Sequence, residues 1–202
     1  MSHNIYFFTF LLTSTIFIYV NPQSALREFV IVKDFFSTFK ADEFSIFDTN
    51  EKTMFYRIES DYAVLQHVKV VAYPSKQEIG RLKSKLNFLL YKAEISILDS
   101  ATNQWIDGTM EQNFKVFHKS YDINWNGHQI KVDGEFSSYM LKFKDTNGEL
   151  LAQFAVRPFT NLWKTKYDMK IFSNKYPEQL YLLALAGHDH VVTKNTKNSK
   201  GK

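Results

Sequence analysis

One pattern occurs three times along the chain: apolar and polar residues alternate, an aspartate follows, and turn residues separate this run from a second alternating run. Alternation with a period of two predicts a half-buried strand, because successive side chains point to opposite faces of a sheet. Asp, Asn and Gly accept the backbone angles that reverse the chain, so each repeat predicts a β-hairpin. These hairpins are residues 44–50 with 54–58, 95–99 with 104–108, and 139–148 with 150–156.

Further strand-like runs fill most of the chain after residue 25, with little helical periodicity between them. Asn126 and Gly127 separate two of these runs and predict a tight type I′ turn. We therefore expect about twelve short strands, a pattern typical of a barrel or a sandwich. The additional runs are residues 29–33, 68–72, 77–82, 114–118, 122–125, 130–132 and 167–171.

Residues 177–187 break the pattern and predict a helix. Pro177 suits its first turn, Glu178 favours its positive N-terminal end, and Gly187 suits its stop. At about 16 Å, this helix is too short to span a hydrocarbon layer of roughly 30 Å. Its leucines are Leu180, Leu182, Leu183 and Leu185.

This helix is apolar on every side, so other elements must surround it. The arrangement that satisfies both the strands and the helix is a closed antiparallel β-barrel with the helix through its lumen. The predicted fold is therefore mainly β, with about twelve strands around a central hydrophobic C-terminal helix.

The net positive charge of the chain comes from its C-terminal residues. Lys and Arg number 25 and Asp and Glu number 21, which gives a net charge of +4. The last nine residues carry four lysines and no acid, so the body is balanced and residues 193–202 are expected to form a disordered basic tail. A balanced body does not supply the basic face that nucleic-acid binding needs, and no nucleic-acid partner is expected.

The pattern of apolar residues near the N-terminus predicts a targeting segment. Residues 5–20 are an apolar run without a charge, and Ala25 offers a cleavage point for a signal peptide. An uncleaved membrane anchor, a misassigned start and a buried segment remain as alternatives. Residues 1–25 as a signal peptide imply the secretory pathway, and otherwise the protein is cytoplasmic or membrane-associated. The chain has no cysteine, so disulfides and cysteine zinc sites are excluded.

Six segments resemble the LURP-one-related branch of the tubby C-terminal-like superfamily. The resemblance covers roughly residues 27–192 and rests on patterns of apolar positions and turns. It implies a twelve-stranded barrel around a C-terminal helix, in agreement with the strand and helix predictions above. The matching segments are residues 29–33, 44–48, 78–82, 149–154, 167–171 and 180–186.

The resemblance implies several functions, because members of the superfamily differ. Tubby proteins bind phosphoinositides through basic residues on the barrel surface, and phospholipid scramblases are associated with calcium-dependent lipid movement. The acidic calcium stretch of scramblases is not matched here, since Asp168 stands between Lys166 and Lys170. Calcium prefers several converging oxygen ligands, so a calcium site is not expected.

Two groups of basic residues are candidates for binding an anionic lipid headgroup. Arg offers bidentate hydrogen bonds to a phosphate, and Lys offers a point charge. The alternative interpretation is a solvated outer face, because basic strand positions alternate with core positions. The candidates are Arg81, Lys83 and Lys85 in one group, and Arg157, Lys164, Lys166 and Lys170 in the other.

Other chemistry is weakly supported. His188, Asp189 and His190 suggest a metal site, but three adjacent residues do not readily face one ion, so no metal and no cofactor is expected. No nucleophile elbow, phosphate-binding loop or dinucleotide motif appears, which argues against an enzyme. Trp105, Trp125 and Trp163 suit a ligand groove or an anchor at a membrane interface, but packing in the barrel core or at its rim is the favoured interpretation.

The resulting hypothesis is a non-enzymatic binding or scaffold domain, residues 26–192, that contacts an anionic membrane lipid or a protein partner. A scramblase-like lipid-handling protein is the alternative. The oligomeric state does not follow from the sequence.

Overall fold

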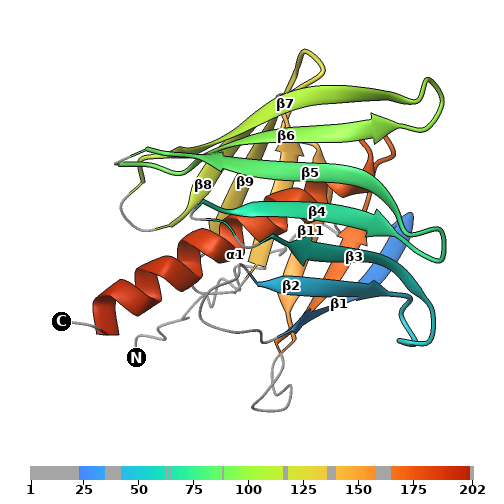
Figure 1. The fold of residues 1–202 in the computed structure, drawn as a ribbon. Coiled ribbons are helices and arrows are strands. Elements are labelled where there is room, and N and C mark those ends of the chain that lie inside the picture. The colour runs from blue at the N-terminus through green and yellow to red at the C-terminus, as the bar shows by residue number, and fades with distance from the viewer. Residues whose placement is uncertain are drawn as a thin grey trace, which may run out of the picture.

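The computed structural model describes residues 23–34, 42–61, 63, 65–87, 89–115, 118–135, 140–157 and 165–200. The N-terminal apolar run at residues 5–20 lies outside the described residues, so its role stays a prediction. The described part forms one closed antiparallel β-barrel with a helix through it, as expected (Figure 1).

Twelve strands close the barrel. Each pairs with its neighbour in the chain, and β1 pairs with both β2 and β12, so the sheet has no free edge. The strands are β1 Arg27–Asp34, β2 Glu43–Phe47, β3 Met54–Ser60, β4 His67–Ala72, β5 Gln77–Lys85, β6 Lys92–Asp99, β7 Gln104–Asn113, β8 Ser120–Trp125, β9 His128–Glu135, β10 Met140–Asp145, β11 Leu150–Val156 and β12 Lys166–Ile171.

The three hairpins predicted from the aspartate-containing repeats are confirmed, and each aspartate accepts hydrogen bonds from the backbone of its turn. Asp48 accepts the backbone N–H of Lys52 at 2.7 Å, and Asp99 accepts that of Ala101 at 3.1 Å. Asp145 accepts two backbone N–H groups, each at 2.9 Å. These side chains supply the hydrogen bonds that a reversing backbone cannot make with itself.

Helix α1, Glu178–Lys200, fills the lumen. The side chains of Leu180, Leu182, Leu183 and Leu185 are all buried against the inward faces of the strands, which confirms the central helix. The first turn of α1 is anchored by Glu178, which accepts hydrogen bonds from Tyr56 Oη and Arg27 Nη1, the latter at 2.9 Å.

Two local predictions are wrong. The run at 114–118 is not a strand in its described residues: β7 ends at Asn113, and the Phe114 side chain is largely exposed. Helix α1 continues beyond Gly187 because this glycine serves packing instead of a stop. A Cβ at Gly187 would lie 3.2 Å from both Met110 Sδ and Tyr91 Oη.

The connections divide between the two ends of the barrel because the strands are antiparallel. One end carries the β3–β4, β5–β6 and β7–β8 connections, and here the C-terminal part of α1 leaves the lumen (Figure 1). We call it the helix-exit end. Within the described residues no helix is both long and apolar enough to cross a membrane.

Candidate functional site

The structure separates the two groups of basic candidates. Arg81, Lys83 and Lys85 lie on β5, whereas Lys166 and Lys170 lie on β12. In one direction around the barrel four strands intervene between β5 and β12, and in the other direction six intervene. The two groups therefore occupy nearly opposite walls and do not form one basic face.

The cations on the β12 wall have carboxylate partners. Arg157 lies 2.7 Å from Asp168 and 3.3 Å from Glu51, and Lys166 lies 2.5 Å from the same Glu51. The hydrogen bond from Arg157 to Asp168 raises the pKa of the guanidinium. This wall thus presents an ion-pair network rather than uncompensated positive charge.

The remaining members of that group add little to a binding surface there. Lys170 pairs with Glu28 at 3.4 Å, and both side chains are exposed, so water screens the pair. Lys164 and Trp163 lie outside the described residues, so nothing follows for their roles.

The β5 group differs because two of its cations have no ionic partner among the residues that the structure describes. Arg81, Lys83 and Lys85 point outward, since they alternate with Gly80 and Leu82, which face the core. Lys85 pairs with Glu94 on β6 at 2.7 Å. Within the described part of the chain, no carboxylate lies within 4 Å of the charged groups of Arg81 or Lys83.

Arg81 is held by an aromatic ring instead of a carboxylate. Its guanidinium carbon lies 4.0 Å from the centroid of the Trp105 ring. This stacking is a cation–π contact, and it leaves the N–H groups at the guanidinium edge free to bind an anion. The Trp105 side chain is 36% exposed at the outer surface.

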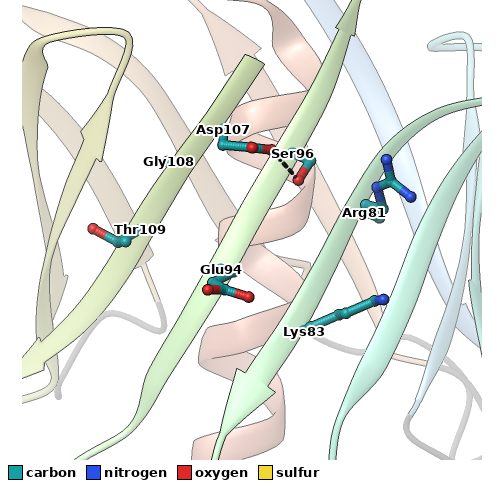
Figure 2. A pocket seen from close by; sticks show the side chains of 7 residues that line it. All are labelled: Arg81, Lys83, Glu94, Ser96, Asp107, Gly108 and Thr109. Atoms are coloured by element: carbon teal, nitrogen blue, oxygen red, sulfur yellow. Dashed lines mark hydrogen bonds between the residues drawn. The ribbon is translucent and has the colours of Figure 1, made fainter. Parts of the chain in front are cut away.

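A groove of about 560 Å³ runs over the outer faces of β5, β6 and β7, and we call it the β5–β7 groove. Figure 2 shows Arg81 and Lys83 on one strand and the acidic side chains on the two next strands. Ser96 donates to Asp107 at 2.5 Å across the β6–β7 pair. The groove lining is Arg81, Lys83, Glu94, Ser96, Asp107, Gly108 and Thr109.

The groove therefore has opposite charges on its two sides. Arg81 and Lys83 line it on β5, whereas Asp107 on β7 and Glu94 on β6, which pairs with Lys85, line it on the other side. Neighbouring strands lie about 4.8 Å apart, so the positive and negative sides are separated by one or two strand spacings. Such an arrangement suits a ligand that carries a phosphate and an ammonium group close together.

Two other hollows in the surface are weaker candidates for an anion-binding site than the β5–β7 groove. The hollow on β2–β4 contains Arg57, which is already paired with Glu43 at 3.2 Å and Asp34 at 3.5 Å. A hollow beside the start of α1 includes Trp125, which is buried and donates from Nε1 to the Ile106 carbonyl at 3.2 Å. Trp125 therefore belongs to barrel packing.

Sequence reasoning missed a buried polar cluster inside the barrel. Lys33 on β1 contacts Asp189 of α1 at 2.7 Å and Asp42 at 2.8 Å, and Tyr167 Oη donates to Asp189 at 3.1 Å. The signal for Lys33 was present, because it continues the inward-facing series of Phe29 and Ile31.

The pKa values within this cluster are perturbed. Burial raises the pKa of Asp189 to about 6, although Lys33 opposes the change, and Asp42 adds to it. Burial alone would lower the pKa of Lys33, but the contacts with Asp189 and Asp42 raise it. We conclude that Lys33 stays charged and that Asp189 titrates at a mildly acidic pH.

The three residues of the suggested metal motif point in different directions around α1. His188 Nδ1 lies 3.2 Å from Tyr121 Oη, Asp189 faces Lys33, and the His190 ring lies beside Tyr91. No group of three metal-ligating side chains occurs among the residues that the structure describes.

Comparison with known proteins identifies the family. A family model described as LURP-one-related matches residues 27–186. No curated protein and no solved structure matches the chain. The matched region runs from the start of β1 into α1 and includes every strand of the barrel. Because this match covers well over half of the sequence, the chain belongs to the LURP-one-related family.

Proposed function

We propose that this LURP-one-related domain is a non-enzymatic binding protein whose β5–β7 groove holds the headgroup of an anionic phospholipid. The observation that carries the proposal is the pair Arg81 and Lys83, which lack carboxylate partners among the described residues while Trp105 supports Arg81. Arg81 binds phosphate oxygens through two parallel N–H groups, and Lys83 adds a point charge.

The acidic side of the groove selects among headgroups. Asp107 would repel a ligand that carries only negative charge, but it attracts an ammonium group, whereas Lys85 already compensates the charge of Glu94. Phosphatidylserine has both a phosphate and an ammonium group and is anionic overall. We therefore propose phosphatidylserine as the preferred headgroup, ahead of phosphatidylglycerol, which has the same net charge and no ammonium.

A binding role agrees with the position of the perturbed acids and bases. Strongly shifted pKa values cluster at catalytic sites in many enzymes. Here His188 and Asp189 are buried against the barrel wall around α1 and are absent from the groove lining. Their contacts join the helix to the barrel, which is a structural role.

Vesicle flotation of the double variant Arg81→Gln, Lys83→Gln tests the proposal. We expect the wild type to float with phosphatidylserine vesicles more strongly than with phosphatidylglycerol vesicles, and the variant to lose this preference. The double variant Lys166→Gln, Lys170→Gln is the matched control, since it removes the same charge from the opposite wall. Equal losses in both variants would show unspecific attraction and contradict a site in the groove.

A further inference from the structure

Exposed large apolar side chains gather at the helix-exit end. Leu89 is 91% exposed, Phe114 is 82% exposed and Leu86 is 75% exposed. Together with Leu65 they form what we call the apolar rim. Leu65 lies in the β3–β4 connection, Leu86 and Leu89 in the β5–β6 connection, and Phe114 directly after β7.

The connections that carry the rim are neighbours at this end, because they join consecutive strands. Strands β3 to β8 are neighbours in the barrel, so their connections follow one another along the helix-exit end (Figure 1). By contrast, the exposed Leu26 lies before β1, at the other end. Apolar side chains exposed together, rather than singly, indicate an interaction surface.

Hydrogen bonds hold the rim connections in place. Tyr91 Oη donates to Gln66 Oε1 at 2.6 Å, and Gln66 Nε2 donates to the Ala186 carbonyl of α1 at 3.0 Å. Gln112 N donates to the Tyr91 carbonyl at 2.8 Å, and Tyr91 N donates to Gln112 Oε1 at 3.2 Å. Gln66 of the β3–β4 connection and Tyr91 at the end of the β5–β6 connection are thereby tied to each other, to β7 and to the helix.

The charge around the rim is complementary to an anionic surface. Three carboxylates near it are paired with lysines: Lys85 with Glu94 at 2.7 Å, Lys92 with Glu111 at 3.0 Å and Lys115 with Asp133 at 3.2 Å. Lys119 and Lys194 also lie at this end, and no carboxylate of the described residues is within 4 Å of either ammonium group. The rim thus combines apolar side chains with lysines, and Asp61 in the β3–β4 connection lies 2.8 Å from His67.

We infer that the apolar rim inserts into the interface of an anionic phospholipid bilayer, so that the barrel stands with its helix-exit end toward the membrane. Leucine and phenylalanine side chains enter the boundary between headgroups and acyl chains, and lysines beside them remain with the lipid phosphates. The inference goes beyond the proposed headgroup site and does not depend on it.

The groove and the rim are arranged in line. Strand β5 runs toward the helix-exit end, so Arg81, Lys83 and Lys85 lead to Leu86. With the rim inserted, the groove opening lies beside the membrane at the level of lipid headgroups. The same orientation therefore serves both contacts.

The double variant Leu89→Ser, Phe114→Ser tests insertion without changing charge. Each fully buried Leu or Phe side chain contributes roughly a factor of ten or more to partitioning. We expect the double variant to bind vesicles at least about tenfold more weakly, with phosphatidylserine and with neutral phosphatidylcholine vesicles alike. Leu26→Ser, at the other end, should bind as the wild type does.

The experiment separates the rim from the groove. The groove variant Arg81→Gln, Lys83→Gln should lose only the preference for phosphatidylserine, whereas the rim variant should lose binding to every vesicle. A rim variant that binds like the wild type overturns the inference and leaves the groove untouched. Ultracentrifugation detects the alternative: a wild type that self-associates, with association rather than vesicle binding lost in the rim variant, also overturns it.

The absence of cysteine permits a direct measurement of depth. Leu89→Cys and Leu26→Cys each provide a single site for a nitroxide label. On vesicles, the label at residue 89 should become accessible to oxygen and shielded from a water-soluble nickel complex, and the label at residue 26 should not change. Equal nickel accessibility of both labels on vesicle-bound protein would contradict insertion.

Discussion

Lys33 on β1 and Asp189 on α1 form a buried ion pair, with Lys33 Nζ 2.7 Å from one carboxylate oxygen and 3.0 Å from the other. Asp42 and Tyr167 also contact this pair. The pair fixes the rotation of α1 against the barrel wall, because a buried charge needs its partner at a defined distance. Next to it, His188 is buried against Tyr121.

Asp189 and His188 have opposite effects on stability between pH 4 and 6.5. The pKa of Asp189 rises to about 6 on folding, so its stabilising effect is complete at low pH and is lost as pH rises through about 6. Burial, with a smaller effect of Lys119, lowers the pKa of His188 to about 4. The contribution of His188 is therefore complete near neutral pH and is lost as pH falls from 6.5 toward 4.

We predict that single substitutions of Asp189 and His188 reveal how each residue makes the free energy of unfolding depend on pH. In Asp189→Asn the free energy of unfolding should rise with pH between 4 and 6.5, and in His188→Gln it should fall, each by up to about 3 kcal/mol. Urea denaturation at a series of pH values measures both slopes. The wild type, in which the two effects oppose each other, should vary less than either variant, and parallel curves for all three proteins would refute the assignment.

Leu183→Ala should destabilise the barrel by about 2–5 kcal/mol, because it opens a cavity where a fully buried helix side chain met the strands. Equilibrium urea unfolding gives the difference. Leu26→Ala serves as the control, since its side chain is exposed and its loss should change stability by no more than about 0.5 kcal/mol. Similar losses at both positions would be inconsistent with a helix enclosed by the barrel.

Gly108→Ala should destabilise the protein by about 1–3 kcal/mol, since the new methyl group has no room. A Cβ at Gly108 would lie 2.5 Å from the Asn124 carbonyl oxygen and 2.8 Å from Trp125 Cδ1, so the β7–β8 pair would have to move. At Gly80 the nearest atom would be Leu183 Cδ1 at 3.4 Å, and Gly80→Ala is the matched control. Thermal unfolding compares the two, and an equal effect would contradict the tight β7–β8 approach.

Trp105→Ala should weaken binding to phosphatidylserine vesicles about two- to fivefold, because Arg81 loses the ring that positions its guanidinium. Trp105→Phe retains an aromatic face and should restore part of the affinity. The readout is the fraction of protein that floats at increasing lipid concentration. If Trp105→Ala bound as tightly as the wild type, the stacked arginine would have no role in recognition.

The alternating runs were sufficient to predict the hairpins, because a two-residue period assigns each side chain to a face without reference to distant residues. The buried helix was predictable for a similar reason, since a segment without a polar face needs an enclosing partner. Gly187 misled the prediction because a helix stop and a close packing contact both favour glycine. Only the distances to Met110 and Tyr91 distinguish these two causes.

The basic residues of the candidate site could be predicted from the sequence, but their partners and their grouping could not. Basic residues on β5 and on β12 look alike in the sequence, but carboxylates from distant segments neutralise the β12 group, Glu51 above all. The stacking of Arg81 on Trp105 joins two strands that are not adjacent, and no local pattern indicates it. The ion pair of Lys33 with Asp189 also joins residues far apart in the chain.

Local periodicity was enough to predict the strands, their turns, the central helix and therefore the closed barrel, because each of these depends on patterns that neighbouring residues carry. The folded structure was needed to show which cations lack a carboxylate partner among the described residues, which apolar residues stay in solvent, and that Arg81 and Lys83 lead to the apolar rim. Those properties depend on distances between segments far apart in the chain, and such distances are set only when the barrel closes around its helix.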